Sequence, residues 1–419
     1  MRRPDVRRCV SVGFSMARSR ISPGRGSIVK PAPQRTTQHL SMLLLVRGVI
    51  VVPIFLQHPS QLSERMAGVL LCKTQYPSPG GSDNMSWKVL VTARAFWVSG
   101  QEAQALLEGA GCTVVWSEKA GPLPVPELIS ALQGCDAIVG SSDPYNAEVF
   151  AACPDLKIVA RCGVGTDSVD MAAATAAGII ATNTPGAMAE GVADYTFALM
   201  LGVCRDIPGA NAMMRNGGWG EIRGASVFKK TLGMVGTGRI GQSVIQRAHG
   251  FSMRVLAYDP PMQASGATLD GVEFVDLDTL LAESDFISLH APATPQTIGL
   301  FNAEAFKKMK STAYIINTAR GSLINEPDLI HALDNDIIAG AALDVYSQEP
   351  LPVDHPLRSA KKCVLSPHNA FNSLESTMEM SLQSALSVLE LMNGDVPRNV
   401  CNPAVWNSAA LRVEKPSGL

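Results

Sequence analysis

The sequence predicts an α/β protein with two Rossmann-like, doubly wound parallel-sheet domains and a cleft between them. Short β-branched runs alternate with longer helical patterns in two series, one at residues 85–186 and the other from 230 to about 367. Alternation of this kind is typical of parallel winding, because each parallel strand needs a crossover before the next one. A last helical pattern, at 373–393, lies beyond the second series and has to return to the first domain.

Residues 1–84 differ in charge from the rest of the 419-residue chain. They carry 12 lysines and arginines against 3 acids, whereas the remaining residues carry 23 against 34. One interpretation of this basic leader is an organelle-targeting transit peptide, and another is untranslated sequence or a disordered extension. Its apolar run at 41–56 is shorter than the ~20 residues that a membrane helix needs, so we expect no membrane partner. The acidic remainder argues against nucleic acid as a partner, because backbone phosphates bind clustered basic side chains.

The nine cysteines are odd in number and show neither a CxxC pair nor a metal-type spacing. Such a pattern favours reduced thiols in a cytoplasmic compartment over a disulfide framework. We therefore expect no metal site, and organelle targeting by the leader stays open as an alternative to the cytoplasm.

The helical pattern at 187–206 links the two series. It is about twenty residues long and carries small and apolar residues at helical spacing. It either crosses from one domain to the next or forms a buried core helix.

A glycine-rich turn opens the second series. Gly236, Gly238 and Gly241 stand in a GxGxxG spacing between a strand-like run and a helical pattern. The first glycine permits a tight turn, the second lets the backbone approach a pyrophosphate, and the third lets helix and strand pack closely. Asp259 ends the next strand-like run, 18 residues after Gly241. A carboxylate there accepts hydrogen bonds from ribose hydroxyls and repels a 2′-phosphate, which predicts NAD rather than NADP.

Ionisable side chains follow the later strand-like runs. His290, Arg320 and His368 each come just after such a run, and an acidic turn with Asp344 and Glu349 follows another. Ligands of a doubly wound sheet lie beyond the carboxyl ends of its strands, so these side chains are candidates for a site. A guanidinium suits a substrate carboxylate or carbonyl oxygen. Both histidines are candidates for proton transfer, and Glu349 is a possible partner that would orient His368.

The body of the chain resembles the D-isomer-specific 2-hydroxyacid dehydrogenase family, and most of all its phosphoglycerate dehydrogenase-like branch. The motifs that carry the resemblance are ARCGVGTDSVD, GVADYTFALML, GMVGTGRIGQ, FISLHAPATPQT, INTARGSLINEPDLIHAL, AALDVYSQEPLP and SPHNA. Their order and spacing cover nearly all of residues 85–405. The resemblance implies a substrate-binding domain at 85–186 and 372–405, an NAD-binding domain at 187–371, and a tail at 406–419.

The resemblance also implies roles for the site residues. Arg320 binds the substrate carboxylate and carbonyl, His368 is the acid/base and Glu349 supports it, while the backbone amides of Val164 and Gly165 bind the carboxylate. The activity implied is hydride transfer between NAD(H) and a small 2-hydroxy or 2-keto acid, in a homodimer. The further residues assigned to the cofactor are Arg239, Ile240, His290, Thr318 and Asp344.

Two segments depart from the phosphoglycerate dehydrogenase pattern. Ser141, Ser142 and Asp143 stand where that branch has an Arg-Ser pair, which is a poor place for a phosphate, although Arg161 is retained. Asn369–Asn372 replaces the glycine common after the Pro-His pair, which leaves the substrate's size open. The alternatives are a glyoxylate or hydroxypyruvate reductase, and an NAD(H)-sensing, corepressor-like binding protein that shares the fold.

Overall fold

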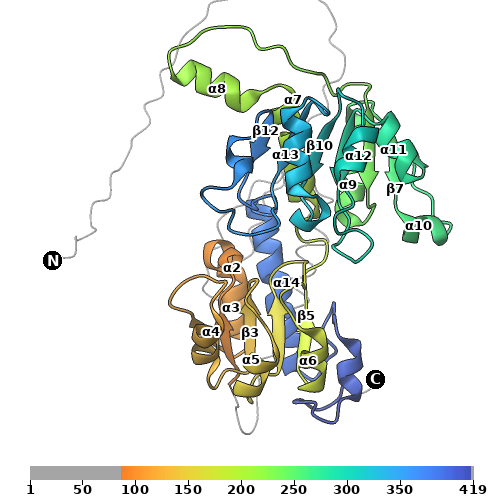
Figure 1. Ribbon diagram of the computed structural model, residues 1–419. Coiled ribbons are helices and arrows are strands. Elements are labelled where there is room, and N and C mark those ends of the chain that lie inside the picture. The colour runs from red at the N-terminus through yellow and green to blue at the C-terminus, as the bar shows by residue number, and fades with distance from the viewer. Residues whose placement is uncertain (1–85, 417–419) are drawn as a thin grey trace, which may run out of the picture. The chain divides into compact units, whose positions relative to one another are not determined.

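The computed structural model describes residues 86–416, and the leader expected at 1–84 lies outside the described residues. Two fully parallel sheets are present, one with the strand order β2-β1-β3-β4-β5 and one with the order β12-β11-β10-β9-β6-β7-β8 (Figure 1). The prediction of two doubly wound parallel sheets is therefore confirmed. Among the described helices, none combines the length and the apolar character that crossing a membrane requires.

The first sheet is buried on both faces. Its strands are β1 (Lys88–Val91), β2 (Thr113–Trp116), β3 (Ala137–Gly140), β4 (Ile158–Arg161) and β5 (Ile180–Thr182). Its crossover helices are α2 (Arg94–Ser99), α3 (Gln101–Gly109), α4 (Val125–Leu132), α5 (Ala147–Ala152) and α6 (Met171–Ala176). Helices α4, α5 and α6 cover one face, and their starts are fixed locally: the side chains of Asn146 and Asp170 cap α5 and α6.

The last long helix, α14 (Leu374–Met392), covers the other face of the first sheet together with α2 and α3. Its residues Met380, Val388 and Leu389 join one core cluster with Val89 and Phe96. The predicted return of this helix to the first series is thus observed.

Residues 406–416, which we expected to form a tail, also pack on this domain. Arg412 donates hydrogen bonds to the carbonyl oxygens of Phe150, Cys153, Leu156 and Ala177.

The second sheet is larger. Its strands are β6 (Thr231–Val235), β7 (Arg254–Tyr258), β8 (Val272–Phe274), β9 (Phe286–Leu289), β10 (Tyr314–Asn317), β11 (Gly340–Leu343) and β12 (Cys363–Leu365). Its helices are α7 (Ala189–Cys204), α9 (Arg239–Gly250), α10 (Pro260–Ala264), α11 (Leu277–Glu283), α12 (Ala303–Lys308) and α13 (Glu326–Asp334). The short 3₁₀ helices are η2 (Gly321–Leu323), η3 (Pro356–Ser359) and, near the end of the chain, η4 (Pro403–Asn407). Both interpretations of the 187–206 pattern hold: α7 leads the chain from β5 of the first sheet towards the second series, and it packs as a core helix with α9 on one face of the second sheet.

Helix α8 (Ile207–Arg215) has no buried side chain; it follows α7 and leads into an extended stretch before β6. Figure 1 shows it at the end of α7, away from the strands of the second sheet. Large apolar side chains are nevertheless exposed here, including Ile207, Met214, Trp219 (89% exposed) and Phe228. An exposed apolar surface of this kind is typical of an interaction site.

Candidate active site

The three side chains predicted to carry the chemistry come from three neighbouring strands. Arg320 follows β10, Glu349 lies in the loop after β11, and His368 follows β12. Because these strands are parallel and adjacent, their carboxyl ends lie at one edge of the sheet. The parallel sheet therefore brings together residues separated by up to 48 positions, as the strand-end pattern in the sequence predicts.

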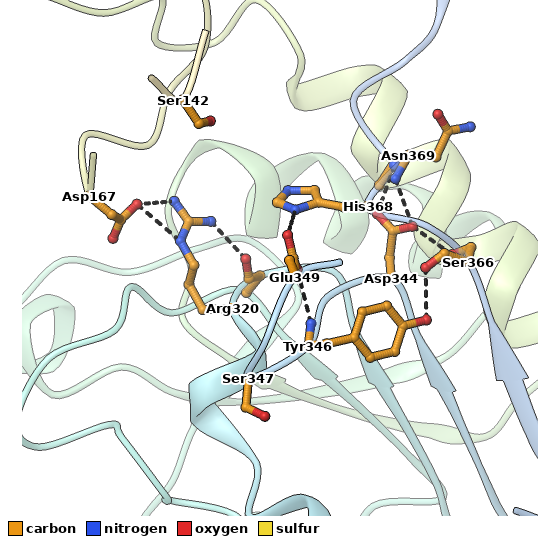
Figure 2. Close-up of polar contacts among 12 residues, drawn as sticks. Ser142, Asp167, Arg320, Asp344, Tyr346, Ser347, Glu349, Ser366, His368 and Asn369 are labelled. Carbon is orange, nitrogen blue, oxygen red and sulfur yellow. Dashed lines mark hydrogen bonds and ion pairs between the residues drawn. The ribbon is translucent and has the colours of Figure 1, made fainter. Parts of the chain in front are cut away.

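His368 and Glu349 form a close pair (Figure 2). The imidazole Nδ1 lies 2.6 Å from Glu349 Oε2, and the backbone N–H of Tyr346 donates to Glu349 Oε1 at 3.0 Å. Burial alone would raise the pKa of Glu349, but the hydrogen bond and charge of His368, the Tyr346 N–H and the charge of Arg320 outweigh it and lower that pKa. A carboxylate bound at Nδ1 fixes the ring orientation and leaves Nε2 for another partner.

The backbone at His368 is held in a left-handed conformation, with a φ of 49°. Asp344 stabilises this turn. Its carbonyl oxygen accepts from the His368 N–H at 2.8 Å, and its carboxylate accepts from the N–H groups of Asn369 and Ala370, each at 2.8 Å. The hydroxyl of Ser366 also donates to this carboxylate, at 2.5 Å. Asp344, which the resemblance assigned to the cofactor, is fully buried and supports the turn that carries the imidazole. No sequence motif indicates this contact.

Arg320 reaches across to the first domain. Its Nε and Nη2 donate to Asp167 Oδ2 at 3.2 and 2.8 Å, and its Nη1 donates to the carbonyl of Ala319 at 2.7 Å (Figure 2). Asp167 belongs to the loop after β4, together with Val164 and Gly165. A Cβ atom at Gly165 would lie 2.2 Å from Arg320 Nη2, so a larger residue there would displace the guanidinium from its present position. Asp167 is not among the residues predicted from the sequence, although it too follows a strand of a parallel sheet.

The pKa of Asp167 reflects this contact. Burial would raise the pKa, but the hydrogen bonds and charge of Arg320 outweigh burial and lower it. The pair is thus an ion pair at neutral pH, joining the carboxyl edges of the two sheets.

The segment that departs from the phosphoglycerate dehydrogenase pattern presents hydroxyls to this region. Asp143 is fully buried, and its carboxylate accepts from the hydroxyls of Thr92 and Tyr145 at 2.6 and 2.9 Å. The acid therefore points into the domain and does not line the site, which corrects the simple inference from its position in the sequence. Arg161 donates from Nη2 to Ser142 Oγ at 3.1 Å and from Nη1 to the carbonyl of Cys162 at 2.6 Å.

The glycine loop has the geometry that a dinucleotide requires. Gly236 has a φ of 89°, and a Cβ there would lie 2.8 Å from the backbone of His290 and Ala291. A Cβ at Gly241 would lie 2.6 Å from the carbonyl oxygen of Gly236. Gly238, by contrast, faces open space, and it begins α9 without any side-chain cap. Uncapped N–H groups at an open helix start suit a pyrophosphate, so the loop fits NAD.

Asp259 follows β7 beside this loop. Its Oδ2 accepts from both the N–H and the hydroxyl of Thr237 at 2.7 Å, and its Oδ1 accepts from the N–H of Met262 at 3.1 Å. These bonds hold the carboxylate next to the glycine turn, where a ribose would follow the pyrophosphate. Arg239 and Ile240 form the first turn of α9.

The two remaining candidates lie at the ends of β9 and β10. His290 is largely buried, and burial lowers its pKa to about 3, so the ring is neutral at pH 7; its Nε2 lies 2.8 Å from Ser288 Oγ. A neutral histidine of this kind is poorly suited to donate a proton, which favours His368 for that role. The hydroxyl of Thr318 lies 3.0 Å from that of Thr196 on α7.

The chain is similar to proteins named as 2-hydroxyacid dehydrogenases and reductases. Residues 197–370 match the family model described as "D-isomer specific 2-hydroxyacid dehydrogenase, NAD binding domain". The chain is 41% identical over 298 residues to a glyoxylate reductase of Korarchaeum cryptofilum, covering 70% of this chain and 90% of that protein. It is 40% identical over 279 residues to a D-3-phosphoglycerate dehydrogenase of Mycobacterium bovis, covering 66% of this chain. The chain spans only about half of that second relative, since the match covers 53% of it.

Solved structures are similar over three quarters of the chain. The TT0316 protein of Thermus thermophilus has a TM-score of 0.69 at 35% identity, with 75% of this chain and 99% of that one covered. The apo-structure of D-lactate dehydrogenase from Escherichia coli has a TM-score of 0.66 at 29% identity, with the same coverage.

Proposed function

This chain belongs to the D-isomer-specific 2-hydroxyacid dehydrogenase family, and on that premise we propose that it reduces a small, unphosphorylated 2-keto acid such as glyoxylate or hydroxypyruvate. It is an NAD-dependent oxidoreductase that acts on the CH–OH group of 2-hydroxy acids. The alternative of a non-enzymatic, corepressor-like binding protein is set aside, because the relatives named above are reductases and dehydrogenases. The observation that supports the proposal most is the His368–Glu349 pair at the ends of strands adjacent to Arg320.

The proposed roles are those that the family resemblance implies, and the geometry of the site supports them. Arg320 binds the carboxylate and the carbonyl oxygen of the keto acid, and the N–H groups of Val164 and Gly165 bind the other side of the carboxylate. His368 donates a proton from Nε2 to the oxygen that becomes the alcohol, because Nδ1 is taken by Glu349. Bound NADH supplies the hydride.

The substrate's size and charge are argued from the loop after β3. Ser142 is exposed, and Ser141 and Ser142 offer hydroxyls where a phosphate would need a cation. Two nitrogens of the nearby Arg161 already donate to Cys162 and Ser142 within the domain. A hydroxyl or hydrogen on the substrate's third carbon suits this surface better than a phosphate.

The cofactor contacts are proposed on the same footing. The glycine loop, with Arg239 and Ile240, holds the pyrophosphate, and Asp259 holds the ribose. His290 and Thr318 follow β9 and β10, and we propose that they line the nicotinamide end of the site, whereas the buried Asp344 supports it indirectly through the turn that carries His368.

The test is a steady-state screen of the purified protein. Glyoxylate, hydroxypyruvate, phosphohydroxypyruvate and pyruvate are each offered with NADH and with NADPH, and oxidation of the cofactor is followed by absorbance. We expect the highest kcat/KM for glyoxylate or hydroxypyruvate with NADH. A higher kcat/KM for phosphohydroxypyruvate would overturn the substrate proposal, and a preference for NADPH would overturn the role of Asp259.

We propose domain boundaries at 85–186 with 372–405 for substrate binding and at 187–371 for the cofactor. Packing of α14 on α2 and α3, and of α7 on α9, supports this division. Residues 406–416 are added to the first domain on the contacts of Arg412.

We also propose a homodimer in a reducing compartment, the cytoplasm. A second copy of the chain is the partner that we propose for the exposed apolar side chains of α8 and the stretch after it. The seven described cysteines are all free thiols, which suits a reducing compartment.

A further inference from the structure

We propose that Glu326 is a positioning residue for the reaction: its buried carboxylate fixes the loop that carries Glu349 against the turn that carries Arg320. The inference rests on the roles proposed above for Arg320, Glu349 and His368. Glu326 itself touches none of these three side chains through a hydrogen bond in the described part of the chain, so any effect on turnover has to pass through the loop.

Glu326 is an unusual helix-start acid. It is the first residue of α13, where acids are normally exposed and interact with the helix dipole, yet only 5% of it is exposed. Its Oε1 accepts from the backbone N–H of Ser347 at 2.7 Å, and its Oε2 accepts from the Ser347 hydroxyl at 2.7 Å. A buried carboxylate is costly unless it is hydrogen-bonded. Both oxygens are therefore committed to one residue of the loop after β11.

A histidine completes the surroundings of this carboxylate. His355 Nε2 lies 3.3 Å from Glu326 Oε2, and His355 Nδ1 accepts from the N–H of Leu357 at 3.3 Å. Since Nδ1 accepts from Leu357, Nε2 is the ring nitrogen that faces Glu326. Within residues 86–416 no lysine or arginine forms an ion pair with Glu326, so its partners are two side chains and one backbone N–H, all tied to the loop and to the η3 region after it.

The loop that Glu326 holds also contains Glu349 and one of its hydrogen-bond donors. Ser347 lies between Tyr346, whose N–H donates to Glu349 Oε1 at 3.0 Å, and Glu349 itself, whose Oε2 lies 2.6 Å from His368. Figure 2 shows Ser347 pointing away from His368 and Arg320, on the opposite side of the loop from the imidazole. Glu326 thus holds the loop from the side that faces away from the reacting groups.

The same loop touches the turn that carries Arg320. A Cβ atom at Gly321 would lie 1.9 Å from the carbonyl carbon of Tyr346 and 2.4 Å from the nitrogen of Ser347, so the two backbones are in contact. Gly321 and Glu326 belong to one short segment that runs through η2 into α13. The segment therefore contacts the loop at two points: Gly321 packs against the Tyr346–Ser347 peptide, and Glu326 bonds Ser347. Arg320 comes from this segment and Glu349 from the loop. The two contacts therefore set the position of Arg320 relative to Glu349 and His368.

Loss of the Glu326–Ser347 contact is expected to lower kcat without changing cofactor binding. A shift of about 1 Å in a catalytic group lowers turnover by up to roughly 10²-fold. Cofactor binding depends on the glycine loop and Asp259, which have no contact with Ser347, so it is expected to stay unchanged. Substrate affinity through Arg320 and the first-domain loop is also largely kept.

The experiment compares Glu326→Gln, Ser347→Ala, Glu349→Gln and the double variant Glu326→Gln/Glu349→Gln. We expect Glu326→Gln to lower kcat by roughly tenfold or more, with the KM of the keto acid and the Kd of NADH, measured by fluorescence titration, within twofold of the parent protein. In the Glu349→Gln background the same change should lower kcat by less than twofold, because its effect passes through Glu349. The matched control is Glu304→Gln, an exposed glutamate at the start of α12 that pairs with Lys307.

Other outcomes would overturn the inference. A folded Glu326→Gln protein with the parent kcat would overturn it. So would a Glu326→Gln substitution that lowers kcat by the same factor whether residue 349 is Glu or Gln. If Glu326→Gln does not fold, Ser347→Ala decides, because it removes one hydroxyl bond and leaves the backbone bond; parent-like turnover in that variant would refute the proposal. Failure of the proposed function looks different, since it would appear as full activity in variants of His368 or Arg320 themselves.

Discussion

Asp167 and Arg320, 153 positions apart, form the ion pair that joins the two domains at the candidate site, with Nη2 to Oδ2 at 2.8 Å. If the substrate carboxylate binds Arg320 as proposed, it competes with the Asp167 carboxylate for the guanidinium. The pair is partly exposed, and such pairs contribute about 0.2–1 kcal/mol. We expect Asp167→Asn to lower the KM of the keto acid by roughly two- to fivefold, with little change in kcat. Steady-state kinetics beside the control Asp155→Asn test this, and a raised KM would instead make Asp167 a substrate-binding residue.

The acid/base and the carboxylate-binding residue are tested by conservative changes. His368→Gln keeps a side chain that can bond Glu349 but removes the transferable proton, so kcat/KM should fall by ~10²-fold or more. Arg320→Lys keeps the charge and loses the two-pronged geometry, and we expect kcat/KM to fall by at least about tenfold. His331→Gln, on the exposed side of α13, is the matched control. Near-normal turnover in either variant, with the protein folded, would remove that residue from the mechanism.

Cofactor choice is tested at Asp259. Replacing it with serine removes the carboxylate that would bind the ribose and repel a 2′-phosphate. We expect the Kd of NADH to rise by roughly tenfold, the scale of one hydrogen bond to a charged group, and the preference over NADPH to shrink. Because Asp259 also caps α10, the control is Asp276→Ser, which alters the equivalent cap of α11 away from the glycine loop. An unchanged ratio of the two dissociation constants would contradict the assignment.

The proposed dimer is tested on its exposed apolar side chains. Trp219→Glu and Ile207→Glu place charges in the predicted interface, and α8 has no buried residue whose loss would unfold the domain. We expect the molar mass from light scattering to fall from that of two chains to that of one. Val353→Glu changes an equally exposed apolar residue elsewhere and should leave the mass unchanged. If the unaltered protein already has the mass of one chain, the dimer proposal is wrong.

Asp285 gives a pH-dependent stability prediction. Burial would raise its pKa, but the N–H of Thr231 and the ammonium of Lys310 outweigh burial and lower it below 3.8. A depressed folded-state pKa means that the stabilisation is present above the unfolded pKa and is lost as pH falls through the folded one. Asp285→Asn should therefore lower the free energy of unfolding by about 1–3 kcal/mol at pH 7. In urea titrations, the difference in the free energy of unfolding between Asp285→Asn and the parent should be smaller below pH 3.8 than at pH 7. The control Asp270→Asn should differ from the parent by close to zero at both pH values.

Much of the fold and part of the site were predictable because they depend on local pattern. The spacing of Gly236, Gly238 and Gly241 reports a turn that only glycine can make, and a parallel sheet puts every strand end at one edge. Arg320 and His368 follow from that rule without any knowledge of distance. Their roles still depend on the experiments above.

Other features depend on contacts between distant segments, which one sequence does not reveal. Nothing near Asp143 indicates that its carboxylate turns inward, because Thr92 and Tyr145 are needed to hold it there. Glu326 looks like an ordinary helix-start acid until Ser347 is seen beside it. Arg412 lies in a segment without regular pattern, and it is the four carbonyl oxygens around it and the burial of Trp406 that show this segment to be part of the first domain.

The place of α14 sets an order of events during biosynthesis. The first sheet leaves the ribosome early, but Val89 and Phe96 need Met380, Val388 and Leu389 to close their cluster. The second sheet, which ends at Leu365, has all of its strands available before α14 emerges. The half of the enzyme that is translated first is therefore completed last, and until Met392 is free of the exit tunnel its apolar face is open to chaperones.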